Sequence, residues 1–208
     1  MLHFLVMTLV CGAPPPAPPT VKPIPDELTQ MAAKMKQVQT LSVAMHQEKT
    51  LLAFGDTLQA DGRLVFARPR RLWMDLTGPG GTTLAINDAQ MAVHYKTLDK
   101  TEHHDLRRDP RAKAVAEHLF LLLDADPVAL AAVYAVSLLK SQPLTVRLVP
   151  LAPALHDVIS SVEAQIDANG FVSRLELLEA NGDKTVWRFS APVINQPVAD
   201  SLFALGNP

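Results

Sequence analysis

The chain has 208 residues and a formal net charge of −2; 48% of its residues are hydrophobic and only 5% are aromatic. This near-neutral charge, with no basic stripe, gives no electrostatic case for a nucleic-acid partner. The single cysteine, Cys11, excludes an intramolecular disulfide and a zinc site built from cysteines. The mostly aliphatic apolar residues, with seven methionines, suit an ordinary core and also a cavity that adapts to flexible chains.

The N-terminal 25 residues are not expected to belong to the folded domain. Residues 1–12 contain a short apolar run that matches a signal peptide and is too short to span a bilayer. Residues 13–25 are rich in proline, which indicates an extended linker or a tail without a role. Cys11 stands where a bacterial lipoprotein carries its lipidated cysteine, or is removed with the signal. We therefore expect an exported protein whose single domain covers 26–208.

That domain opens with an amphipathic helix and continues with strands. Apolar residues at three- and four-residue spacing predict a helix over 26–38, with Asp26 as its N-cap. From Leu41 the apolar period changes to two, which indicates strands. We expect strands over 41–45, 58–68, 70–76, 82–86, 90–96, 101–106, 135–139, 144–149, 158–167, 172–179 and 185–190.

Two helices are expected to interrupt these strands. Asp109-Pro110 and Asp126-Pro127 each combine an N-cap with a first-turn proline, so helices are predicted over 111–123 and 128–133. The fold class is α+β and mainly β: about ten to eleven antiparallel strands that curl into an incomplete barrel, with three helices as its plug.

No catalytic or metal-binding motif accompanies this pattern. A phosphate-binding loop, a nucleophile elbow and a His-Glu-x-x-His sequence are all missing. His103 and His104 are neighbours on a predicted strand and so face opposite sides, although His94 could join one of them across strands. We expect no enzyme, no cofactor and no metal, with these histidines on the solvated surface.

One stretch, 62–76, carries an unusual charge. Leu64, Phe66 and Arg68 share one face of a predicted strand, which places a cation in line with an apolar row. A buried cation is costly unless it is paired. Arg68 therefore either ends its strand in water beside Pro69 or has a partner inside the fold.

This stretch resembles the outer-membrane lipoprotein carrier family (LolA). The pattern Gly62-x-Leu64-x-Phe66-x-Arg68-Pro69 is similar to the family's strand that ends in Arg-Pro. The chain departs from the family in two lining positions, where Met45 and Met74 replace a phenylalanine and a tryptophan. Other similar segments follow in order: Met45-His46-Gln47, Val93 and Tyr95 after the turn at 87–89, Tyr134-x-Val136, Asn195-x-Pro197, and Asp200-Ser201-Leu202-Phe203.

The resemblance implies a curved barrel whose helices form a lid over an apolar cavity. Such a monomer would carry acylated lipoproteins or lipids across the periplasm, from an inner-membrane lipoprotein-releasing ABC transporter to an outer-membrane acceptor of the same fold. It also implies that Arg68 bonds backbone carbonyls of the lid and latches it. The residues expected to line the cavity are Leu64, Phe66, Leu72, Met74, Leu76, Leu84, Ile86, Val93, Tyr95, Leu119, Leu122 and Leu123.

Two other functions stay open. The chain could be an acceptor of the same fold (LolB-like), tethered to the outer membrane through Cys11 and facing the periplasm; the segment 51–54 would then be its apolar loop. It could instead be a periplasmic sensor or scaffold that uses the fold to bind a protein.

Overall fold

The structure, a computed structural model, describes residues 26–204. The predicted signal peptide, the Pro-rich linker and Cys11 lie outside the described residues.

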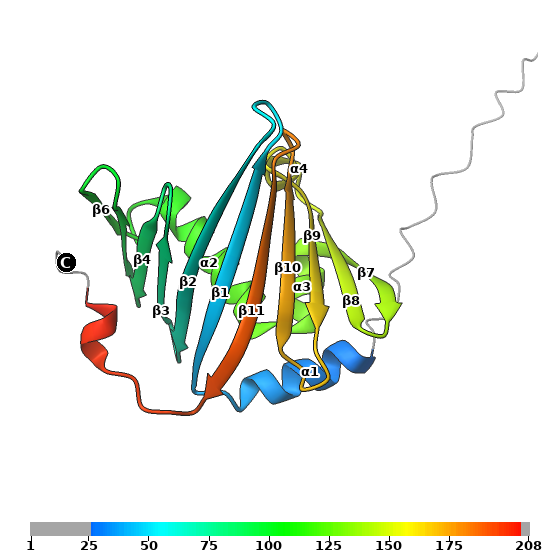
Figure 1. Cartoon of the computed structure of the whole chain (residues 1–208). Coiled ribbons are helices and arrows are strands. Elements are labelled where there is room, and N and C mark those ends of the chain that lie inside the picture. The colour runs from blue at the N-terminus through cyan, green and yellow to red at the C-terminus, as the bar shows by residue number, and fades with distance from the viewer. Residues whose placement is uncertain (1–25, 205–208) are drawn as a thin grey trace, which may run out of the picture.

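A single antiparallel sheet forms the body of the protein (Figure 1). Its spatial order is β6-β5-β4-β3-β2-β1-β11-β10-β9-β8-β7, so two meanders meet where the first and last strands pair. The expected fold class is confirmed: eleven antiparallel strands make an open, curved sheet. The strands are β1 (Thr40–Leu51), β2 (Asp56–Ala67), β3 (Arg71–Thr77), β4 (Thr82–Asn87), β5 (Gln90–Tyr95), β6 (Lys100–Asp105), β7 (Tyr134–Ser141), β8 (Leu144–Pro150), β9 (Ile159–Ile166), β10 (Val172–Glu179) and β11 (Lys184–Ile194).

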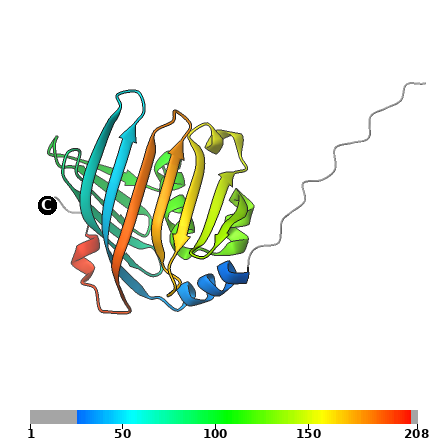
Figure 2. The ribbon, with the colours of Figure 1, turned by 45° about the vertical axis from the view of Figure 1, so that its right-hand side comes forward.

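The helices cover one side of this sheet. Strands β6 and β7 lie at opposite edges, and the chain between them contains α2 (Pro110–Asp124) and α3 (Pro127–Val133). This connection has to cross the face of the sheet, and Figure 2 shows the sheet curving around it. Helix α1 (Asp26–Lys36) lies across one end of the strands before the chain enters β1.

Several boundaries differ from the sequence prediction. Strand β2 ends at Ala67, so Arg68 lies in the turn to β3 and not within the strand. Strand β1 extends to Leu51, because its second half pairs with both β2 and β11. This half is polar and has no apolar alternation, so the sequence pattern did not predict it as a strand. The short helix α4 (Pro153–His156) and the 3-10 helix η1 (Asp200–Phe203) were not predicted as helices, since four residues show no period.

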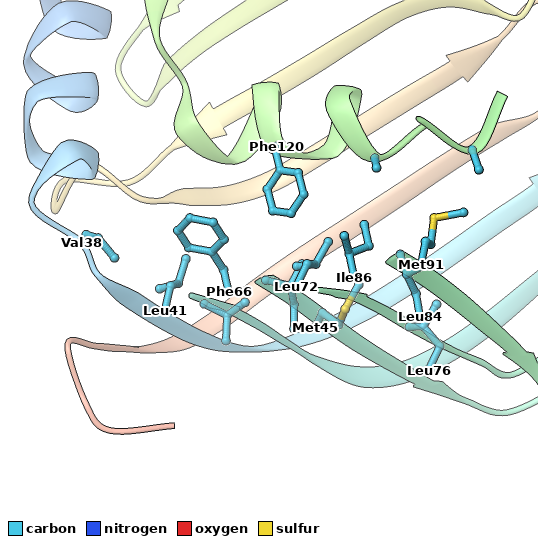
Figure 3. Packing of buried hydrophobic residues seen from close by; sticks show 14 of the residues in the cluster. Val38, Leu41, Met45, Phe66, Leu72, Leu76, Leu84, Ile86, Met91 and Phe120 are labelled. Atoms are coloured by element: carbon cyan, nitrogen blue, oxygen red, sulfur yellow. The ribbon is translucent and has the colours of Figure 1, made fainter. Parts of the chain in front are cut away.

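The main core lies between the concave face of the sheet and the helices (Figure 3). Phe66 of β2 is fully buried, and Phe120 of α2 points at it with the ring centroids 6.3 Å apart. Leu72 and Ile86 continue the same face across β3 and β4. Alternation along each strand thus places one apolar row under the helices.

The opposite face of β2 and β3 has its own small apolar cover. Phe203 of η1 is fully buried against Val65, Ala67 and Trp73. Leu202 and Phe203, part of the C-terminal segment that resembles the family, therefore cover the outer side of the sheet at β2 and β3.

Removing this cover should destabilise the fold. Phe203→Ala is expected to lower the free energy of unfolding by about 3–5 kcal/mol, because a fully buried ring leaves a cavity that the rigid sheet cannot close. Ser201→Ala, an exposed position of the same 3-10 helix, is the control and should change it by less than about 0.5 kcal/mol. Denaturant titration measures both. A loss below about 1 kcal/mol for Phe203→Ala would show that η1 contributes little.

Candidate functional site

The two crossing helices begin in the same way. The Asp109 carboxylate accepts hydrogen bonds from the backbone N–H groups of Arg111 and Ala112 at the start of α2. Asp126 does the same for Val128 and Ala129 at the start of α3. These side chains satisfy amide groups that a helix start leaves without partners. Both caps were predicted from the Asp-Pro pairs.

The helices cover the concave face without filling the space beneath them. An apolar cavity of about 230 Å³ lies between α2 and the sheet. Leu119, Leu122 and Leu123 form its helical side. His118 of α2 also lines it, and the rest of the lining comes from both meanders: Met45, Leu64, Leu72, Met74, Ile159, Val162, Val172, Leu175, Leu177, Trp187 and Phe189.

A second apolar space of about 80 Å³ lies toward α1. Met31 and Met35 of α1 line it together with Phe171 and Ala125. The two spaces adjoin, because both are lined by Leu64, Leu122, Leu123, Val172 and Phe189.

The residues predicted to line the cavity fall into three groups. Leu64, Leu72, Met74, Leu119, Leu122 and Leu123 line it directly. Phe66, Leu76, Leu84 and Ile86 are buried in the adjoining core, against which Val93 packs. Tyr95 is half-buried at the end of β5, next to the turn into β6, and lines neither space.

The contribution of β9, β10 and β11 was missing from the predicted lining. Leu175 and Leu177 alternate along β10, and Trp187 and Phe189 alternate along β11. These two-residue spacings were visible in the sequence. The sequence did not show which face of each strand is concave.

Arg68 connects three elements at the end of this site. Its Nε donates to the carbonyl of Val38 (2.9 Å) and its Nη2 to that of Met35 (3.2 Å), where α1 ends. Its Nη1 lies 2.9 Å from Oδ1 of Asp124, the last residue of α2. The two charged groups form an ion pair, but the contact does not have the geometry of a hydrogen bond. Arg68 thus has partners inside the fold: two carbonyls at and just beyond the end of α1, and a carboxylate at the end of α2.

The turn that carries Arg68 also contacts the aromatic core. The Arg68 guanidinium lies 5.5 Å from the centroid of the Phe66 ring, and the Arg70 guanidinium lies 4.9 Å from that of Phe120. Arginine over an aromatic face is stabilised by the ring quadrupole. The contact of Arg70 with α2 was not predicted, because strand alternation says nothing about side chains in a turn.

One polar pair lies in the wall of the larger cavity. His118 of α2 lines the cavity, and its Nε2 lies 2.7 Å from the hydroxyl of Tyr134, the first residue of β7. Burial lowers the pKa of His118, because an imidazolium loses hydration in apolar surroundings. The ring is therefore neutral at neutral pH.

Two of the histidines considered as metal ligands, His94 and His104, have separate partners. The Nδ1 of His94 lies 3.0 Å from Oγ1 of Thr101, and that of His104 lies 2.8 Å from Oδ2 of Asp109. Within residues 26–204 there is no group of three or more side chains arranged to hold a metal ion. In the same range, no helix is long and apolar enough to cross a bilayer.

Comparison with known proteins bears on this arrangement. The family model of the outer membrane lipoprotein carrier protein LolA matches residues 36–206. No curated protein sequence matches the chain significantly.

Solved structures are similar at low identity. A domain of an outer membrane lipoprotein-sorting protein from Vibrio parahaemolyticus has 10% identity and a TM-score of 0.45, over 85% of this chain and 94% of the other. A LolA superfamily protein from Nitrosomonas europaea has 10% identity and a TM-score of 0.44, over 86% and 96%. The Mycobacterium tuberculosis lipoprotein LppX has 13% identity and a TM-score of 0.47, over 84% and 97%.

Acid should weaken the two helix caps. Backbone hydrogen bonds, from Ala112 to Asp109 and from Ala129 to Asp126, lower the pKa of each carboxyl, with smaller contributions from His104 and Lys36. A carboxyl whose pKa is lower in the folded state stabilises that state above the ordinary value of 3.8, and this stabilisation is lost as the pH falls through the folded value.

The variant Asp109→Asn/Asp126→Asn keeps the caps but removes their titration. Its free energy of unfolding should fall less than that of the unmodified protein between about pH 5 and about pH 2.5. Denaturant titrations over this range measure the difference. Identical slopes in the two proteins would show that the caps do not contribute to acid sensitivity.

Proposed function

Because the chain belongs to the family of the outer membrane lipoprotein carrier protein LolA, we propose that it is a periplasmic carrier of lipoproteins. It binds their acyl chains in the cavity under α2 and takes them from the inner to the outer membrane. The observation that carries this proposal is an almost wholly apolar cavity covered by helices that connect opposite edges of the sheet.

The energetics of acyl transfer require such a cavity. Each methylene exposed to water costs about 0.8 kcal/mol, so an anchor with about 40 of them would cost roughly 30 kcal/mol to expose. An apolar lining rich in leucine and methionine makes transfer from a bilayer nearly balanced in free energy. Met45 and Met74 suit this role, because unbranched thioether side chains adapt to irregular ligands.

The cavity in its present form is too small for a complete lipid anchor. An apolar cavity of about 150 Å³ accepts benzene, so about 230 Å³ corresponds by proportion to roughly nine carbons. A complete anchor with several acyl chains therefore requires α2 and α3 to move away from the sheet. We propose that the structure is the closed, empty state of the carrier.

Arg68 is the proposed latch of this state. It contacts the end of α1 and the end of α2 from a turn of the sheet, so opening the lid has to break or rearrange its contacts with Met35, Val38 and Asp124. Guanidinium suits the role, because it presents several donors in a fixed plane and stays protonated. A latch that favours the empty state also favours release of cargo.

A second candidate is an anchored outer-membrane acceptor. It is supported by the loop between β1 and β2, where the side chains of Leu52 and Phe54 are 64% and 77% exposed. An exposed apolar tip suits contact with a membrane or a partner. This reading also requires lipidation of Cys11, so mass spectrometry of the mature N-terminus decides between the two: a diacylglyceryl group on Cys11 excludes the free carrier.

Bound lipid tests the proposal directly. Native mass spectrometry of the protein purified from its cells should detect the protein with bound acylated molecules, which dissociate from it as lipid. Leu122→Glu should reduce the bound fraction by about tenfold or more, because it places a carboxylate in the cavity wall. Val115→Glu, at an exposed position of the same helix, is the matched control. Absence of any acylated species from the unmodified protein would contradict the carrier.

The latch is tested by transfer rather than by binding. Arg68→Leu should still load a lipoprotein released from inner-membrane vesicles but deliver about tenfold less to the acceptor, since the empty closed state is no longer favoured. Arg63→Leu is the control, because Arg63 lies on the other face of β2 and bonds Ser42. Normal delivery by Arg68→Leu in a reconstituted assay would contradict the proposed role of Arg68 as a latch.

A further inference from the structure

The cavity wall contains a hydrogen-bond donor for which residues 26–204 supply no well-aligned acceptor. His118 lines the cavity on α2, and Tyr134 lies behind it at the start of β7 with only 1% of its surface exposed. The tyrosine hydroxyl lies 2.7 Å from Nε2 and 3.1 Å from Nδ1 of the ring. Within residues 26–204, neither side chain has another hydrogen-bond partner.

The His118–Tyr134 pair contains more polar hydrogens than the bond between the two side chains uses. A neutral imidazole has one N–H and one bare nitrogen, and a phenol has one O–H. The Tyr134 oxygen lies near both ring nitrogens, but the N–H directions of an imidazole diverge in the ring plane, so one oxygen cannot lie in line with both. The shorter contact, to Nε2, uses one of the two hydrogens, and the other has no well-aligned acceptor within residues 26–204. The lowered pKa of His118 agrees with a neutral ring.

The surroundings decide where the unused hydrogen lies. If His118 donated to Tyr134, the tyrosine O–H would stay unpaired in a cluster of Leu130, Leu148 and Val162, which is unfavourable for a buried donor. If Tyr134 donates to His118, the unused hydrogen is an N–H on a ring that lines the cavity. The second arrangement places the donor where a ligand can reach it.

We propose that the N–H of His118 donates to the carbonyl oxygen of the bound acyl chain, so that the cavity prefers an acyl group to plain hydrocarbon. This inference rests on the proposed lipid-binding function and names a specificity-determining residue for it. An ester, an amide or a free fatty acid can supply the oxygen. The otherwise apolar lining supports this reading, because one fixed polar group in an apolar pocket orients a ligand.

Competition with a fluorescent apolar dye, N-phenyl-1-naphthylamine, tests the preference. Undecane and methyl decanoate, both delivered from cyclodextrin, match the size of the cavity and differ in the carbonyl. The ratio of their affinities is compared between the unmodified protein and His118→Leu/Tyr134→Phe. This double variant removes the imidazole N–H and the phenol O–H and replaces the polar pair by two apolar side chains. The preference for the ester should fall about two- to tenfold in the variant.

Two controls separate a contact with ligand from a change of fold. Tyr134→Phe alone keeps the imidazole N–H and should keep the preference for the ester, whereas His118→Leu alone should lose it. Met74→Leu changes the lining without changing its polarity and should leave the ratio unaltered. The carbonyl stretch of methyl decanoate labelled with ¹³C should lie at lower wavenumber in the unmodified protein than in the double variant.

The outcomes are distinct. An equal ratio and an equal carbonyl frequency in the two proteins would overturn the assignment to His118 and indicate that water satisfies the donor. Failure of both probes to displace the dye from the unmodified protein would overturn the lipid cavity as well. Decanoate, tested at about pH 8 as a third probe, distinguishes the sources: displacement that depends on His118 indicates free fatty acid, and displacement by the ester alone indicates an esterified lipid.

Discussion

The structure depends on the need to cover the concave face of an open sheet. Strands β6 and β7 stay at opposite edges of the eleven-stranded sheet, so the sheet has a large apolar face, and residues 26–204 provide no second sheet to pack on it. The connection between those edges is the natural cover, because the chain has to cross there. Helices α2 and α3 bury the face but leave about 230 Å³ of apolar space beneath them.

The same arrangement gives the cover two kinds of attachment. One is apolar contact, represented by Phe120 against Phe66. The other is polar and concentrated in the turn after β2, where Arg68 contacts the ends of α1 and α2 and Arg70 lies over Phe120. In the proposed carrier, apolar contacts can be exchanged for acyl chains at little cost, whereas opening of the lid would break the arginine contacts. This division of roles suits a protein that binds loosely enough to release.

Much of this was predictable from the sequence, and the exceptions have physical causes. The period-two pattern and the Asp-Pro caps predicted the sheet and the crossing helices, and the apolar row that ends in Arg68 pointed to the site. Strand alternation did not identify the partners of Arg68. The family resemblance implied backbone carbonyls of the lid, and the structure places two such partners, Met35 and Val38, about thirty residues away at the end of α1. The sequence pattern also showed no sign of His118, since the contact with Tyr134 forms only when α3 turns the chain into β7.

The most direct test of the account measures whether the lid moves. Spin labels at Arg63→Cys on β2 and Val115→Cys on α2, in a chain with Cys11→Ser, report the distance between sheet and lid. If the lid opens for cargo, the empty protein shows one short distance, and a second, longer population appears when a triacylated lipopeptide is added. Binding of the lipopeptide with an unchanged distance distribution would contradict it.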